Sequence, residues 1–102
     1  MRIITRRTLR EFWERHPQAH APLAAWHKNA KLAEWRNFAE VRADYNSADY
    51  RGQLTIFDIG GNKYRLVAYV RYTSETNIGR VWVRHVFTHA QYDGWSKARS
   101  KR

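Results

Sequence analysis

The chain has 102 residues, of which 43% are hydrophobic and 15% aromatic, and its 19 Lys and Arg against 9 Asp and Glu give a formal net charge of +10. That length suits one domain, residues 1–102, and the apolar content favours a packed core over a disordered basic chain. No run approaches the ~20 apolar residues of a membrane helix, the N-terminus lacks the apolar segment of a signal peptide, and no cysteine is present for a disulfide or a thiolate metal site. We therefore expect a cytoplasmic protein that does not enter a membrane.

Helices are predicted in the first half of the chain. Thr8 and Glu11 have the spacing of a capping box, ahead of an amphipathic run that Pro17 ends. Pro22 suits the first position of a second helix, because its missing N–H is not needed there. A second capping pattern at residues 37–40 predicts a short third helix.

Strands are predicted at residues 2–4, 54–59, 63–72 and 80–88. Between the second and third of them, Gly60-Gly61-Asn62 is a strong hairpin signal. Alternation in the last two strands assigns these residues to the helix-covered side: Tyr64, Leu66, Ala68, Val70, Tyr72, Val81, Val83, His85 and Phe87. The opposite, solvent-facing side should then collect Arg65, Arg71 and Arg84.

These elements predict an α+β fold, a compact domain with N-terminal helices packed on one face of a twisted antiparallel sheet. Residues 94–102 read as a basic C-terminal tail, and its part from Ser96 onward is expected to be mobile unless bound.

Positive charge is concentrated in the last part of the chain. Residues 59–102 hold nine Lys and Arg against two acids, so they carry +7 of the total +10. Such an excess favours a polyanionic partner, nucleic acid above all, over a surface that is merely well solvated; an acidic protein is the other candidate. The residues expected to contact RNA are Arg71, Arg80, Trp82, Lys97 and Arg99. Trp82 could stack on a base or pack against the N-terminal strand.

His89 is the candidate proton carrier. RNA is cleaved without metal when its 2′-hydroxyl attacks the adjacent phosphorus, which needs a base, an acid and cations for the developing charge. Histidine suits either proton role, and Lys63, Arg65 and Arg84 could supply the cations. A polar loop residue bonded to backbone is an equally good reading of His89. The five histidines have no zinc-like spacing, so we expect neither a metal nor a cofactor.

Two neighbours of His89 have open roles. Tyr92 could stack on a base or act as an acid, although packing onto the sheet is the stronger reading. Asp93 could orient His89 or cap the turn before Gly94.

Motifs in family-like order and spacing run from residue 1 to about 93, and together they resemble the HigB-type toxins of type II toxin–antitoxin modules. They are Met1-Arg2-Ile3-Ile4, Arg7-Thr8-Leu9-Arg10-Glu11-Phe12-Trp13-Glu14, His16-Pro17, Leu23 to Trp26, Gly61-Asn62-Lys63-Tyr64-Arg65-Leu66, Val83-Arg84 and Thr88-His89-Ala90-Gln91-Tyr92-Asp93.

The resemblance implies a RelE-like fold and a metal-independent endoribonuclease, an mRNA interferase that often cuts mRNA on the ribosome. It also implies a cognate antitoxin with a helix-turn-helix domain, and operator DNA bound only through the toxin–antitoxin complex. Lys63, Arg65, Arg84, His89 and Tyr92 match the motif positions best placed for an active surface. Two alternatives stay open: a non-catalytic RNA-binding or ribosome-associated domain, and a toxin-like protein whose activity has decayed.

Overall fold

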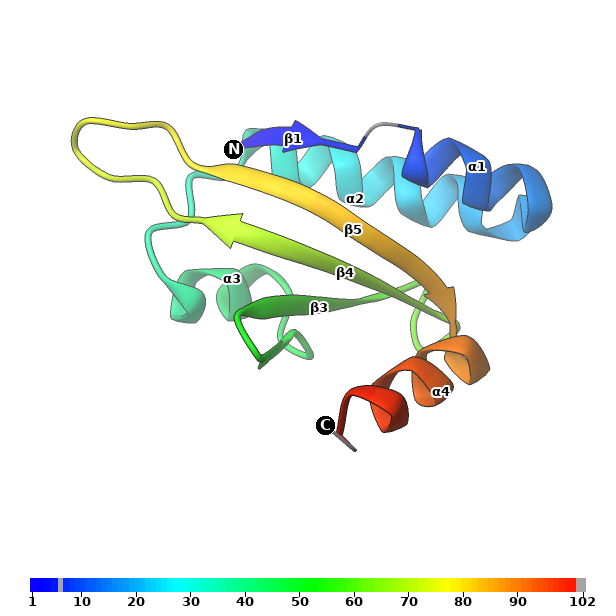
Figure 1. Cartoon of the computed structure of the whole chain (residues 1–102). Helices are drawn as coiled ribbons and strands as arrows, with labels where there is room; N and C mark the ends of the chain where they lie inside the picture. Colours follow the sequence, from blue (N-terminus) through cyan, green and yellow to red (C-terminus); the bar gives the residue numbers. More distant parts are fainter. Residues whose placement is uncertain (6, 101–102) are drawn as a thin grey trace.

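The chain runs from a short strand through helices into a sheet and ends in a further helix (Figure 1). A computed structural model describes residues 1–5 and 7–100. In chain order the elements are β1 (Arg2–Ile4), α1 (Thr8–Arg15), a 3-10 turn (Pro17–Ala19), α2 (His20–Leu32), α3 (Phe38–Asp44), β2 (Asp49–Arg51), β3 (Leu54–Ile59), β4 (Tyr64–Arg71), β5 (Arg80–Thr88) and α4 (His89–Ser100).

The strands form one sheet of order β1-β5-β4-β3-β2 in the described residues, which confirms the predicted α+β class. The sheet is mixed rather than antiparallel, because β1 pairs with β5 in parallel. Strand β2 was not predicted from sequence. Its three residues are all exposed, and three residues are too few for an alternating pattern to indicate a strand.

The helix starts differ in part from the predictions. Thr8 is the first residue of α1 but caps nothing: Arg7 before it has a φ of 74° and the N-cap makes no side-chain hydrogen bond. Helix α2 begins at His20, two residues before Pro22. At α3 the predicted cap is confirmed, since the Asn37 side chain accepts a hydrogen bond from the Glu40 N–H at 3.0 Å.

Helices α1, α2 and α3 cover one face of the sheet, where the core lies (Figure 1). Trp26 of α2 packs edge-on against Phe57 of β3, with ring centroids 5.3 Å apart, and both side chains are buried. Leu66, Ala68 and Val81 line the same side without exposure to solvent. Burial of these apolar side chains is the main driving force that holds the helices on the sheet.

An irregularity in β5 changes which side chains face the helices. Val67 pairs with His85 but Ala68 pairs with Val83, so Arg84 is an extra residue on β5. A bulge of this kind reverses the alternation beyond it. Val86 is therefore buried in the core, whereas His85 and Phe87, predicted to face the helices, lie on the opposite face.

Helix α4 lies on that opposite face and replaces the predicted tail over residues 94–100; Lys101 and Arg102 lie outside the described residues. Its Trp95 ring lies 5.6 Å from His85 and 5.5 Å from Phe87. The helix start is capped reciprocally, since the Thr88 N–H donates to Gln91 Oε1 and the Gln91 N–H donates to Thr88 Oγ1. Thr88-His89-Ala90-Gln91 is a capping-box sequence, a signal in the chain that predicts this helix.

Candidate active site

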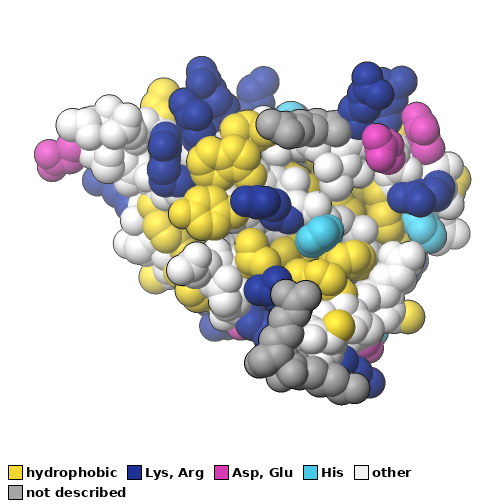
Figure 2. All heavy atoms as spheres, in the orientation of Figure 1, with side chains coloured by type: hydrophobic (Ala, Val, Ile, Leu, Met, Phe, Trp, Pro, Cys, Tyr) yellow, Lys and Arg dark blue, Asp and Glu magenta, His cyan; other side chains and the backbone are white. Residues whose placement is uncertain are grey.

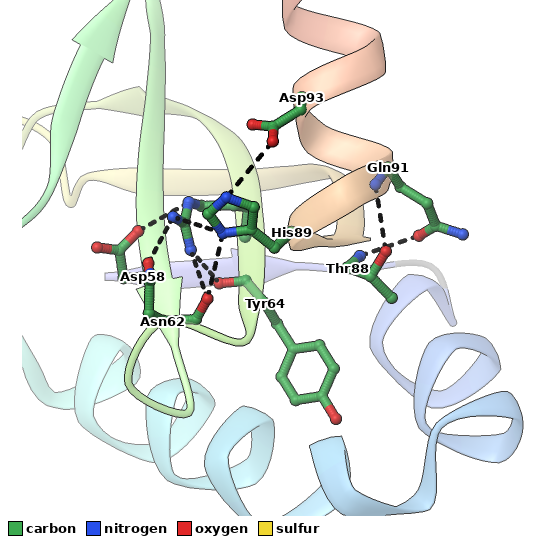
Figure 3. A network of polar contacts seen from close by, with 8 residues as sticks. Asp58, Asn62, Tyr64, Thr88, His89, Gln91 and Asp93 are labelled. Carbon is green, nitrogen blue, oxygen red and sulfur yellow. Dashed lines mark hydrogen bonds and ion pairs between the residues drawn. The ribbon is translucent and has the colours of Figure 1, made fainter.

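A polar network joins the start of α4 to the β3–β4 hairpin (Figure 3). The His89 backbone N–H donates to the Lys63 carbonyl at 3.1 Å. The His89 ring Nδ1 lies 3.3 Å from Arg65 Nη2 and 3.4 Å from the Asn62 carbonyl oxygen, and Nε2 lies 3.4 Å from Asp93 Oδ2. We call Asp58, Asn62, Arg65, His89 and Asp93 the His89 network.

The contacts of Arg65 favour one arrangement of the His89 ring proton. A guanidinium can only donate, so its contact with Nδ1 needs that nitrogen unprotonated. The proton then lies on Nε2, directed at the Asp93 carboxylate. A bond from Nδ1 to the Asn62 carbonyl would need the other tautomer or a protonated ring. The Asp93 carboxylate contacts His89 Nε2, as the orienting role considered for Asp93 from the sequence requires.

Arg65 organises the hairpin rather than facing solvent. Its guanidinium pairs with Asp58 at 3.0 Å, and only 12% of its side chain is exposed. It also donates to Asn62 Oδ1 at 2.6 Å and to the Asn62 and Tyr64 carbonyls. The prediction of a freely exposed Arg65 is wrong, because the turn at residues 60–63 folds its carbonyls and Asp58 onto the guanidinium.

The structure brings four of the five predicted catalytic residues to this corner. Lys63 is exposed on the turn, and its ammonium has no hydrogen bond or ion pair within residues 1–5 and 7–100. Tyr92 is half-buried, with its ring 5.8 Å from Arg65 Cζ and 5.9 Å from the Trp95 ring. Arg84 is the exception. It is exposed at the β5 bulge, and no contact joins it to the His89 network in the described part of the chain.

The residues predicted to contact RNA divide into two groups. Arg71, Arg80 and Trp82 lie at the far end of β4 and β5 from His89, while Lys97 and Arg99 lie on α4. Arg99 Cζ lies 4.8 Å from the Trp95 ring centroid. We call the sheet surface that carries Arg71, Arg80, Trp82 and His85 the open face. Figure 2 shows this side, where a hydrophobic patch over the sheet is bordered by Lys and Arg side chains.

His85 is a candidate that sequence reasoning missed, since the bulge places it on the open face. Its ring stacks on Phe87 at 5.1 Å. Burial first, and then the positive charges of Arg84 and Arg99, lower the pKa of His85 from its ordinary value. A neutral imidazole bordered by cations can accept a proton or stack on a base.

The lowered pKa of His85 predicts a loss of stability in acid. The unfolded chain binds this proton more readily than the folded one, so the free energy of unfolding should fall as the pH drops below about 6.5. Urea unfolding of the wild type and of His85→Phe, which keeps an aromatic ring, should show the larger loss between about pH 8 and about pH 5 in the wild type. Equal losses in both proteins would contradict the prediction.

No group of three or more His, Cys, Asp or Glu is arranged to hold a metal ion within residues 1–5 and 7–100. None of the described helices has the length and apolar character needed to cross a membrane.

Comparison with known proteins places the chain among toxins. Residues 19–95 match the family described as HigB_toxin, RelE-like toxic component of a toxin-antitoxin system. The mRNA interferase toxin HigB of Escherichia coli K12 is 29% identical over 96 residues, which are 91% of this chain and 88% of that protein. The mRNA interferase HigB of E. coli O6:H1 is 27% identical, over 91% of this chain and 89% of that protein. Because the family model matches most of the chain, the chain belongs to the HigB toxin family, the RelE-like toxic components of toxin–antitoxin systems.

Proposed function

We propose that this protein is an endoribonuclease that cleaves mRNA without a metal ion. The observation that carries the proposal is the His89 network, in a chain similar to two proteins named mRNA interferases. An imidazole held between Arg65 and Asp93 lies at the same exposed corner as Lys63, whose carbonyl accepts the His89 backbone N–H. A proton carrier and a cation are two of the components that cleavage by the 2′-hydroxyl requires.

The chemistry follows from the ring's position. The 2′-oxygen attacks the neighbouring phosphorus, its proton leaves to a base, and the 5′-oxygen departs with a proton from an acid, which yields a cyclic phosphate. The ring nitrogen of His89 that carries no proton would take the proton of the 2′-hydroxyl, and Asp93 would stabilise the imidazolium that forms. Lys63 would neutralise charge on the non-bridging oxygens.

A second residue is needed for proton transfer, and it would lie in the exposed part of the site. The Tyr92 ring lies 5.8 Å from Arg65 Cζ, and the positive charges of Arg84 and Arg99 act on His85. Tyr92 is the nearer to His89, only three positions along α4, so it is the candidate partner in proton transfer. Arg84 would act on the substrate from the open face.

The partners of this activity are part of the same proposal. A cognate antitoxin with a helix-turn-helix domain would inhibit the enzyme, and operator DNA would be bound only through that complex. The substrate would be mRNA, free or bound to the ribosome. The basic open face is the surface that suits such a polyanion.

Induced expression tests the proposal directly. Growth arrest is expected with new 5′ ends in cellular mRNA, mapped by primer extension, and co-expression of the adjacent helix-turn-helix reading frame should abolish both. Purified protein should cleave RNA equally well in the presence of EDTA. Arrest with intact mRNA would favour instead a non-catalytic RNA-binding domain, a reading to which the fully bonded Arg65 lends some support.

A further inference from the structure

Three arginines form one row across the end of the open face farthest from His89. Arg80 of β5 is the register partner of Arg2 on β1 and of Arg71 on β4. Neighbouring strands are about 4.8 Å apart, so three positive side chains project side by side from one face. All three line a single pocket of about 290 Å³ with Thr76, Asn77 and Ile78 of the 73–79 loop. We call Arg2, Arg71 and Arg80 the arginine row.

The row is unfavourable for the isolated fold. Like charges directly opposite each other on a sheet destabilise it. Within residues 1–5 and 7–100, no acidic side chain pairs with Arg2, Arg71 or Arg80. A bound polyanion would remove the repulsion and release counterions.

Aromatic side chains form the next row toward the His89 network. Tyr69 and Trp82 are register partners with ring centroids 5.5 Å apart. Arg71 Cζ lies 6.0 Å from the Trp82 ring, so the cation and the aromatic surface adjoin. Tyr69 is 37% exposed although it is a large aromatic residue. Aromatic surfaces beside a positively charged groove bind unpaired bases by stacking and the adjoining phosphates by charge. A duplex or an acidic peptide has no unpaired base to stack on the aromatic surface.

The rows lead along the two strands toward the catalytic corner. After Arg71–Arg80 and Tyr69–Trp82 come Val67–His85 and Arg65–Phe87. Arg65 and Arg71 are six residues apart on β4, roughly 20 Å along an extended strand. That separation places the arginine row beyond the scissile phosphate, on another part of the same RNA strand.

We propose that the arginine row, with Tyr69 and Trp82, is a holding site for single-stranded RNA away from the point of cleavage. The site deepens the proposed function and rests on it for the identity of the substrate. The row would bind backbone phosphates, and the aromatic pair would stack on the adjoining bases.

Binding of a short 2′-O-methyl RNA oligonucleotide tests the proposal, because the blocked 2′-oxygen prevents cleavage and affinity is measured apart from catalysis. Fluorescence anisotropy would compare the wild type with Arg2→Gln/Arg71→Gln/Arg80→Gln at several salt concentrations. Affinity falls with salt, and each phosphate contact contributes about −0.7 to the slope of log affinity against log salt for a single strand. Loss of three contacts should therefore make the slope less negative by about 2. Affinity at low salt should fall at least about tenfold.

A matched variant separates the row from net charge. Lys28→Gln/Lys31→Gln/Arg36→Gln removes the same charge from exposed positions on and after α2, and it should leave affinity within about twofold. Trp82→Ala should weaken binding about tenfold with an unchanged salt slope, because stacking releases no counterions. The single variant Arg80→Gln should unfold at a higher urea concentration than the wild type, since it removes the central charge of the row.

Three results would overturn the proposal: equal losses in the row and control variants, an unchanged salt slope, or binding of a duplex as tight as that of the single strand. Loss of antitoxin binding with unchanged RNA affinity would also reject it and assign the row to a protein partner. If the wild type cleaves no RNA but the row variant still loses oligonucleotide affinity, the proposed nuclease activity fails while the holding site stands.

Discussion

Replacing His89 with glutamine is expected to slow RNA cleavage by about 100-fold or more, with little change in stability. Glutamine retains hydrogen-bonding capacity but cannot carry a proton at neutral pH. The backbone bond from residue 89 to the Lys63 carbonyl does not depend on the side chain. The rate of the variant should therefore vary less between about pH 5 and about pH 8 than that of the wild type.

The measurement is single-turnover cleavage of an RNA oligonucleotide over that pH range, with circular dichroism as the folding control. His27→Gln is the matched control, because His27 lies on α2 and outside the His89 network. It should cleave at the wild-type rate. A wild-type rate and pH profile in His89→Gln would reduce His89 to a residue that attaches α4 to the hairpin, and would move the search to Tyr92 and His85.

Replacing Arg65 with alanine is expected to lower both stability and activity. The change leaves Asp58 without its partner and removes the donor to Asn62 Oδ1 and to His89 Nδ1. Breaking a largely buried ion pair from one side costs about 3 kcal/mol, so urea unfolding should shift by about that amount. Cleavage should fall by about 100-fold even when corrected for the folded fraction, because the imidazole loses its orientation.

Arg84→Ala is the contrasting variant. Arg84 is exposed, so its loss should change the free energy of unfolding by less than about 0.5 kcal/mol. Cleavage should still fall by about 100-fold if the side chain neutralises phosphate charge. The double variant Asp58→Asn/Arg65→Ala should recover part of the stability but not the activity. An Arg65→Ala protein as stable as the wild type would show that the Asp58 pair contributes nothing in solution.

Local patterns in the chain predicted most of the elements. The hairpin at Gly60-Gly61-Asn62 and the strands around it lie where turn residues and alternation place them. The third helix begins at its predicted cap, Asn37. These features depend on neighbouring residues alone, which is why sequence reasoning reaches them.

Two errors arose from contacts that the local pattern does not encode. The bulge at Arg84 reverses the faces of His85 and Val86, and it exists only through the pairing of β5 with β4. Arg65 was expected in solvent, but the folded turn and Asp58 enclose its guanidinium. Helix α4 differs from both, because the capping box at Thr88 and Gln91 is a local sequence signal for the start of this helix.

The amino-acid sequence was enough to predict the α+β class, the concentration of charge in the last part of the chain, and the family to which the motifs belong. It also singled out Lys63, Arg65, His89 and Tyr92. The folded structure was needed to show that these four residues meet at one corner, that Arg84 lies elsewhere, and that Arg2 completes a row with Arg71 and Arg80. The reason is strand register: it is set by packing and pairing between segments far apart in the chain, and a shift of one residue moves a side chain to the other face.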